Sequence, residues 1–387
     1  MTSKILLRNG QVLLADNRFA QTDILVADGL IREIAAGADP EAEIWDLDGM
    51  LLMPGLVDLH GDAFERQVMP RPKVNFPMDM ALIDTDRQLI ANGITTAFYG
   101  LTYSWEPGLR GRDAAFVFIE AMARLKPQML CDGRVHLRQE VHNVAGEADV
   151  LGWLSQGKID LLAFNDHLWM IKRDVQNPEK LGAYAGRAGI PPAAFLELVQ
   201  AIDAKGNAVP GSIERLAAAA RKAGVAMASH DDDTPAKHDG YADLGCRLCE
   251  FPLNRETADT ARARGNAVIM GAPNVVRGGS HTNGLSASAM IRDGMCAVLT
   301  SDYYYPSMLH AAFRLANDGI CSLAEAWNLI SAKPAEMVGL SDRGMIAEGK
   351  RADLVAIDAG GGSPRIAGVF AKGAPVLLAD RRLRPSR

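Results

Sequence analysis

The sequence contains little cysteine, few aromatic residues and no excess of positive charge. Five cysteines in 387 residues are an odd number that does not suggest a disulfide framework, and reduced thiols in a cytoplasm are the simpler interpretation. Aromatic residues make up 6% of the chain, and they form no run suited to stacking nucleobases. The formal net charge of −6 removes the electrostatic basis for non-specific binding to nucleic acid.

Long hydrophobic runs are also missing. No apolar stretch approaches the roughly 18–20 residues that a membrane span needs, and the first residues lack the apolar region of a secretory signal. We therefore expect a cytoplasmic protein that acts neither at a membrane nor on nucleic acid. With 48% hydrophobic and 23% charged residues the composition is ordinary for a globular protein, and the length favours one large domain plus a small one.

Both ends of the chain are rich in short strands. Apolar runs separated by Asn-Gly and Asp-Gly turn pairs fill the first fifty residues or so, and the C-terminal stretch has the same character, as in Leu354–Ile357. We expect residues 1–52 and 345–387 to form one small β-sandwich domain together.

The middle of the chain, residues 53–344, repeats an alanine-rich helix, a glycine and a short apolar strand, as in Ala219–Gly224 followed by Val225–His230. Glycine just past a helix adopts the left-handed cap without steric cost, and continuously apolar strands are typical of parallel sheets. About eight such strands predict an α/β fold with a (β/α)₈ barrel of the TIM type. A doubly wound sheet is the rival, but no G-x-G-x-x-G motif follows an early strand. Residues 170–210 predict an inserted helical segment over the barrel mouth.

Polar residues end five of the predicted barrel strands, and all of them are able to bind a metal ion. They are three imidazoles and three carboxylates: His60, Asp62, Glu140, His167, His230 and Asp302. The carboxyl ends of barrel strands meet at one rim, where active sites are built. A single histidine or aspartate at a strand end is more often a loop hydrogen-bonding group, so the prediction depends on five strands ending in this way.

These residue types indicate a metal-dependent hydrolase. Mixed nitrogen and oxygen ligands suit Zn²⁺, with Mn²⁺ and Fe²⁺ as alternatives, and Glu140 is able to bridge two ions. Two ions would lower the pKa of a shared water toward neutrality, and Asp302 is the natural general base for its proton. His136, inside a predicted strand, and His310, on a predicted helix, are expected to be structural. Cys246 and Cys249 lack a second CxxC pair, which favours thiols without metal.

Cationic and glycine-rich segments follow two of the barrel strands. Arginine's planar fork suits phosphate oxygens, and a glycine-rich loop suits an anion because it offers backbone amides. Cations beside a rim rich in carboxylates indicate a strongly anionic substrate. We therefore expect a small phosphorylated substrate. The alternative is that these cations form structural salt bridges. The candidate binding residues are Arg71, Lys73, Arg277, Gly278, Gly279, Ser280 and His281.

Several phrases of the sequence resemble those of the amidohydrolase superfamily, namely Met53–His60 and Gly349–Val355. Within it the chain is similar to the diphosphatase branch of phosphonate degradation. That likeness rests on Pro70–Val74, Ser229–Asp232, Glu250–Pro252, Met270–His281 and Ser301–Tyr304.

The resemblance implies hydrolysis of α-D-ribose 1-methylphosphonate 5-triphosphate, or a close analogue, between its α and β phosphates. Pyrophosphate is released and the 5-phosphate remains. The resemblance also implies that the six strand-end residues are the metal ligands of a two-ion centre. The resemblance then implies that Glu140 bridges the two ions, a role that a carbamylated lysine has in most of the superfamily.

The sequence departs from this branch at places that do not include a proposed ligand. The branch usually has His-Thr-Asp-Asn where this chain has His60–Ala63, and a Pro-Gly-Gln-Arg-Gln-Phe run where it has Leu168–Arg173. Hydrolysis of a C–N bond, in a cyclic amide or an amine-bearing ring, is therefore the alternative activity. A metal-stabilised scaffold for protein binding is disfavoured because it would need fewer ligands and no spare base. A homodimer is compatible with the sequence.

Overall fold

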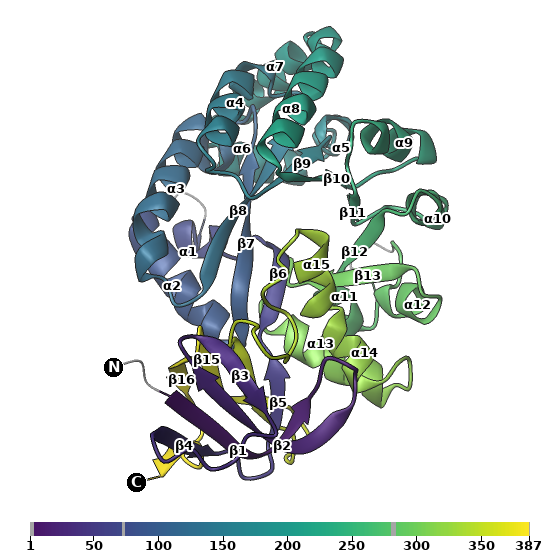
Figure 1. The fold of residues 1–387 in the computed structure, drawn as a ribbon. Helices are drawn as coiled ribbons and strands as arrows, with labels where there is room; N and C mark the ends of the chain where they lie inside the picture. Colours follow the sequence, from purple (N-terminus) through teal and green to yellow (C-terminus); the bar gives the residue numbers. More distant parts are fainter. Residues whose placement is uncertain (1–3, 72–73, 280–283, 387) are drawn as a thin grey trace.

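Two sheets organise the chain in the computed structural model, which describes residues 4–71, 74–279 and 284–386 (Figure 1). One sheet has nine strands from the two ends of the chain, and the other has eight strands from the middle. The predicted α/β fold, a (β/α)₈ barrel with a small strand-rich domain formed from both termini, is confirmed. The domain boundaries at residues 52 and 345 stay a prediction.

The terminal sheet encloses its own apolar core. Its strands are β1 (Lys4–Leu13), β2 (Phe19–Ala27), β3 (Leu30–Ile34), β4 (Ala42–Asp46), β5 (Leu51–Pro54), β14 (Leu354–Asp358), β15 (Arg365–Ala371), β16 (Ala374–Leu378) and β17 (Pro385–Ser386). The first half of β1 pairs with β4 and its second half with β5, so the sheet divides into two branches. Trp45 and Phe370 meet edge to face between these strands, with ring centroids 5.6 Å apart.

The barrel strands are parallel and neighbour one another in chain order. They are β6 (Leu56–Gly61), β7 (Ile94–Tyr103), β8 (Asp132–Glu140), β9 (Leu161–Asn165), β10 (Ala226–His230), β11 (Leu248–Glu250), β12 (Ala267–Gly271) and β13 (Cys296–Thr300). The last strand meets the first through a parallel bridge between Gly61 and Asp302. That bridge joins the two edges of the sheet at the rim where the strands end.

Successive side chains along each barrel strand point alternately into the barrel interior and outward toward the surrounding helices. On β11, Cys249 belongs to the cluster that includes the surrounding helices, whereas Leu248 belongs to a separate cluster formed largely by the strands. Successive side chains of a strand point to opposite faces, so Glu250 lies on the same face as Leu248. By the same alternation His230 follows Ala228 on β10, and both side chains reach the interior near its rim.

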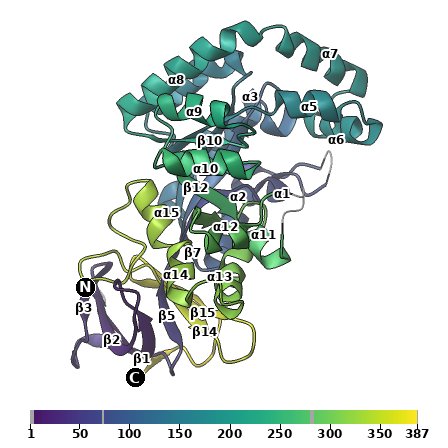
Figure 2. The same cartoon turned by 90° about the vertical axis from the view of Figure 1, so that its right-hand side faces the viewer.

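Helices surround the barrel (Figures 1 and 2). They are α1 (Glu65–Val68), α2 (Met78–Ala91), α3 (Arg112–Leu125), α4 (Glu147–Ser155), α8 (Val209–Ala223), α9 (Pro235–Asp243), α10 (Arg255–Ala263), α11 (Ala272–Arg277), α12 (Ala287–Arg292), α13 (Ser307–Asn317), α14 (Leu323–Asn328) and α15 (Ala332–Met337). The predicted glycine cap is seen after α8, where Gly224 has a φ of 69°. Within the described residues, no helix has both the length and the apolar character needed to cross a membrane.

Three further helices lie between β9 and β10, as the sequence predicts for residues 170–210. They are α5 (Leu168–Asp174), α6 (Pro178–Ala188) and α7 (Pro192–Asp203). Phe195 is fully buried among them and stacks on Tyr184, with ring centroids 5.8 Å apart. Figure 2 shows these helices at the end of the molecule opposite the terminal sheet.

The start of β8 is held by a buried cluster of charges. The Asp132 carboxylate accepts hydrogen bonds from Arg343 at 2.6 Å and from Arg134 at 3.1 Å, and it lies 3.5 Å from Arg351. Burial raises the pKa of Asp132, but the surrounding arginines outweigh it and lower the value to about 2. The cluster therefore ties the first residue of β8 to the segment that leads back into the terminal sheet.

We expect Asp132→Ala to lower the free energy of unfolding by about 3–5 kcal/mol, because removing one partner of a buried ion pair leaves charge uncompensated. Arg343 and Arg351 are only 6% and 8% exposed. Equilibrium denaturation in urea measures the change. Arg255→Ala, which breaks exposed ion pairs on α10, is the control and is expected to cost about 1 kcal/mol or less. Equal losses in the two variants would contradict the role given to Asp132.

Candidate metal centre

Three of the barrel strands end in a residue whose backbone is left-handed. Asp231 follows β10 with a φ of 54°, Phe251 follows β11 with 53°, and Asp302 lies just beyond β13 with 54°. Such backbone costs about 1–3 kcal/mol for a non-glycine residue and persists where neighbouring contacts enforce it. Each of the three amides donates to a carbonyl of another barrel strand, at 2.8–3.0 Å. The left-handed residues therefore turn the chain at the rim, while their amides still take part in hydrogen bonds between barrel strands.

The first cluster of candidate ligands lies where the barrel closes. His60, Asp62 and Asp302 have ligand atoms within 4.8 Å of one another. Their backbones are joined as well, since the Asp302 amide donates to the His60 carbonyl at 2.8 Å and the Asp62 amide donates to the Asp302 carbonyl at 3.0 Å. The structure thus brings together three of the residues that the sequence predicts to bind metal.

A second cluster lies beside the first, at the ends of β9 and β10. His167, His230 and Asp231 have ligand atoms within 4.8 Å of one another. His167 Nε2 is 3.2 Å from the Asp231 carboxylate, and His230 Nε2 is 3.7 Å from it. Glu140 accepts a hydrogen bond from His167 Nδ1 at 2.6 Å. In this arrangement the Glu140 carboxylate orients His167, and the bridging role expected for it stays a prediction.

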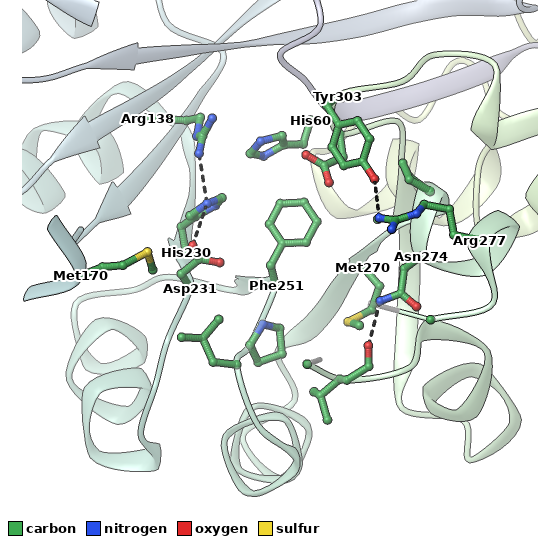
Figure 3. A pocket seen from close by; sticks show the side chains of 18 of the residues that line it. His60, Arg138, Met170, His230, Asp231, Phe251, Met270, Asn274, Arg277 and Tyr303 are labelled. Carbon is green, nitrogen blue, oxygen red and sulfur yellow. Dashed lines mark hydrogen bonds and ion pairs between the residues drawn. The ribbon is translucent and has the colours of Figure 1, made fainter. Parts of the chain in front are cut away.

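Arg138 lies between the two clusters. One nitrogen of its guanidinium donates to the Asp62 carboxylate at 3.0 Å, and another donates to His230 Nε2 at 3.1 Å. The residue is buried, with 6% of its surface exposed, and Figure 3 shows it pointing toward His230 at the edge of the pocket. A fixed positive charge is therefore present among the carboxylates of the rim.

The electrostatic setting keeps most of the histidines neutral. Burial, and next the Arg138 charge, lower the pKa of His60 to about 3. Burial and Arg138 also lower the pKa of His230 far below its usual value. For His167, burial lowers the pKa, but the Glu140 and Asp231 carboxylates outweigh it and raise the value to about 9. Burial, followed by the nearby Asp62 carboxylate, raises the pKa of Asp302 to about 7.

The donor set of both clusters fits a metal ion. Each cluster combines imidazole nitrogen with carboxylate oxygen, the ligand types of zinc and related ions in hydrolases. Neutral imidazole is the form that binds metal, and His60 and His230 are held in that form by burial. A ring of carboxylates so close together also repels itself electrostatically, and bound cations relieve that repulsion.

A pocket of about 600 Å³ opens onto the two clusters. His60, His230 and Asp231 line the pocket together with Arg277 and Tyr303 (Figure 3). Asp302 lines it as well. Arg277 donates to the Tyr303 hydroxyl at 3.4 Å. The remaining wall is mostly apolar and is formed chiefly by Trp169, Met170, Phe251, Pro252, Leu253 and Met270.

The predicted phosphate-binding residues are placed unequally by the structure. Arg277 and Gly279 line the pocket, and Gly278 lies between them in the chain. Arg71 is exposed, pairs with Val74, and is not among the described residues that line the pocket. The other candidates, Lys73, Ser280 and His281, lie outside the described residues.

Several residues of the site were not among the predicted ligands. Arg138 lies two positions before Glu140 on β8, so the period of two along a strand was the signal that could have found it. Asp231 directly follows His230 in the sequence. Glu250 ends β11, which is the same strand-end signal that identified the other ligands. His136, expected to be structural, lies with its Nε2 3.6 Å from the Glu250 carboxylate.

Solved structures share this fold over nearly the whole chain. N-isopropylammelide isopropylaminohydrolase from Burkholderia multivorans has a TM-score of 0.65 at 19% identity, covering 97% of this chain and 98% of that one. 5-Methylcytosine deaminase from Klebsiella pneumoniae has a TM-score of 0.64 at 14% identity, with the same coverage. At such identities the likeness shows the architecture only.

Sequence comparison gives a more specific relationship. The chain is 34% identical over 361 residues to the α-D-ribose 1-methylphosphonate 5-triphosphate diphosphatase of Escherichia coli K12, which covers 90% of this chain and 93% of that protein. A segment of 56 residues, 14% of the chain, is 45% identical to 13% of the dihydroorotase of Bacillus cytotoxicus. The Amidohydrolase family matches residues 92–376. The chain therefore belongs to the amidohydrolase family.

Proposed function

We propose that the protein hydrolyses α-D-ribose 1-methylphosphonate 5-triphosphate, or a close analogue, to the 5-phosphate and pyrophosphate in phosphonate metabolism. The observation that carries the proposal is the 34% identity to the Escherichia coli diphosphatase over 90% of the chain. Arginines in a pocket that also contains the two ligand clusters support it independently. A substrate with several negative charges uses both the arginines and the metals, whereas a neutral amide needs only the metals.

Two divalent ions, zinc first and manganese or iron next, complete the proposed site. His60, Asp62 and Asp302 would hold one ion, and His167, His230 and Asp231 the other, with Glu140 as bridge or as the partner of His167. When bound, such ions would supply a hydroxide at neutral pH and would neutralise charge on the phosphates.

The residues of the chain supply the proton acceptor and the remaining positive charge. Asp302 lies at the rim next to His60 and Asp62, and in this proposal it would take the proton of the attacking water. Arg138 reaches Asp62 from β8 and lines the pocket, and it would hold a phosphate oxygen there. Arg277 stands on another part of the pocket wall and would bind the pyrophosphate that leaves.

Hydrolysis of a C–N bond is the second candidate function. Structural neighbours with this fold include a deaminase and an isopropylaminohydrolase, and the apolar wall around Trp169 and Phe251 suits an organic ring. Paired assays separate the two candidates. Metal-loaded enzyme is incubated with the ribose triphosphate, and pyrophosphate is measured. A panel of cyclic amides and aminated rings is tested in parallel for ring opening and ammonia. Turnover confined to the panel would overturn the proposal.

Asp302→Asn is expected to fold normally and to lose about 10²–10⁴-fold in kcat, the usual contribution of a general base. The amide keeps the volume of the side chain but cannot accept the proton. Steady-state kinetics measure the loss, and elemental analysis of the same preparation checks that metal is retained. A kcat within a factor of about three of wild type, on the same scale, would reject Asp302 as the base.

Arg277→Ala is expected to weaken pyrophosphate binding by about one to two decades, the size of a charge-assisted contact. The metal content should not change, and the loss should shrink as salt rises, because screening weakens the deleted contact. Lys73→Ala is expected to act in the same direction. Calorimetric titrations at two salt concentrations test this. Arg314→Ala removes an exposed arginine that pairs with Asp318 on α13 and serves as the control. Identical affinities in all four proteins would contradict a phosphate-binding wall.

Glu140→Gln is expected to lower the bound metal from two ions toward one per chain, because a neutral amide does not offset the repulsion between two dications. Elemental analysis after dialysis measures the stoichiometry. Two ions still bound would remove Glu140 from the bridge and leave it the contact with His167 Nδ1.

A further inference from the structure

One buried carboxylate contacts histidines of both ligand clusters. Glu250 is fully buried, and its Oε2 atom lies 3.2 Å from Nδ1 of His60 and 3.2 Å from Nδ1 of His230. The two imidazole rings are stacked, with centroids 5.3 Å apart and planes inclined by 15°. His60 belongs to the first cluster and His230 to the second, so a single oxygen atom touches both.

The surroundings of Glu250 leave it few other partners. His136 also faces Oε2, at 3.6 Å, but its Nδ1 donates to the Leu59 carbonyl at 3.0 Å. The other carboxylate oxygen, Oε1, has no hydrogen-bond partner among the described residues. Phe251 packs edge-on against the rings of both His60 and His230, at 5.0 and 5.3 Å. The two contacts with Nδ1 atoms, at 3.2 Å, are therefore shorter than the contact of the carboxylate with His136.

An ionised Glu250 carboxylate would select one tautomer of both imidazoles. An ionised carboxylate only accepts hydrogen bonds, so a contact with Nδ1 requires Nδ1–H on both rings. A neutral imidazole with a proton on Nδ1 has its lone pair on Nε2, and that lone pair is what a metal ion binds. The contacts of His230 Nε2 agree with a lone pair on that atom, because it accepts a hydrogen bond from Arg138 at 3.1 Å, and the Asp231 carboxylate of the second cluster lies 3.7 Å away.

We propose that Glu250 is a positioning residue that turns His60 and His230 toward the two metal sites together. One oxygen atom accepts both Nδ1–H groups, fixes both tautomers and sets both ring orientations. Glu250 also lies with His60 and His136 in a group whose ligand atoms are within 4.8 Å of one another. In the proposed role it orients ligands and is not one itself, because its contacting oxygen accepts from the two Nδ1–H groups. The inference rests on the metal centre of the proposed function but does not depend on the substrate.

This role predicts that Glu250 affects both ions. Carboxylates that orient ligand histidines typically contribute 10–100-fold to metal affinity. Glu250→Ala is therefore expected to weaken binding of both ions by that amount. Glu250→Gln keeps an oxygen that accepts from Nδ1–H and should recover most of the affinity, with both ions bound.

The experiment measures metal binding without any substrate. Metal-stripped wild type, Glu250→Ala and Glu250→Gln are titrated calorimetrically with Zn²⁺, and the visible spectra of the Co²⁺-loaded proteins report ligand geometry. Circular dichroism checks the fold of each variant. Asp86→Ala is the matched control, since Asp86 is a buried carboxylate that accepts hydrogen bonds from the Leu130 and Cys131 amides and belongs to neither ligand cluster.

The expected result is a loss of affinity at both metal sites for Glu250→Ala, recovery in Glu250→Gln and unchanged binding in Asp86→Ala. Two outcomes would overturn the proposal. If Glu250→Gln and Glu250→Ala both lose one ion completely, Glu250 is itself a ligand. If Glu250→Ala binds both ions with wild-type affinity and an unchanged Co²⁺ spectrum, the carboxylate positions nothing. Failure to hydrolyse the ribose triphosphate would overturn the proposed substrate but would not affect the metal-binding result for Glu250.

Discussion

The closure of the barrel by backbone hydrogen bonds between its first and last strands is the interaction on which the site depends. The Asp302 amide donates to the His60 carbonyl, and the Asp62 amide donates to the Asp302 carbonyl. These bonds bring the two ends of a long stretch of chain to one point, and three candidate ligands lie at that point. Asp58, buried behind them, accepts hydrogen bonds from the Ser301 amide and hydroxyl and so holds the same junction from below. The hydrogen bonds that close the barrel therefore also set the positions of these three candidate ligands.

The charges at the rim are compatible with the metal ions and the anionic substrate that we propose. Carboxylates at or just beyond the ends of β6, β8, β10, β11 and β13 lie around a small volume, and Arg138 contacts both ligand clusters. Divalent ions would relieve the repulsion between these carboxylates, and Arg277 on another part of the pocket wall would attract the phosphates of the proposed substrate. Glu250 differs from the other carboxylates of the rim because one of its oxygen atoms contacts Nδ1 of a histidine from each ligand cluster.

Much of the architecture could be predicted from the sequence, because its signals are local. Short apolar strands after a capping glycine identify the barrel strands, and polar residues at their ends identify most of the rim. Arg138 and Glu250 were not predicted as site residues, because their roles depend on contacts between distant parts of the chain. β8 and β11 are far apart in the sequence, and only the closed barrel brings both residues to His230. The position of Arg71 outside the pocket lining likewise follows from the path of its loop. The residue types in the loop do not determine that path.

The most direct test of the central claim is to follow turnover of α-D-ribose 1-methylphosphonate 5-triphosphate by phosphorus-31 NMR in water enriched with ¹⁸O. The account predicts that metal-loaded enzyme forms pyrophosphate and the 5-phosphate in equal amounts. One ¹⁸O atom should be found on a phosphorus of the products, and none on the sugar carbon. Release of orthophosphate, loss of intact triphosphate by C–O cleavage, or an unchanged spectrum from enzyme that turns over a cyclic amide would contradict it.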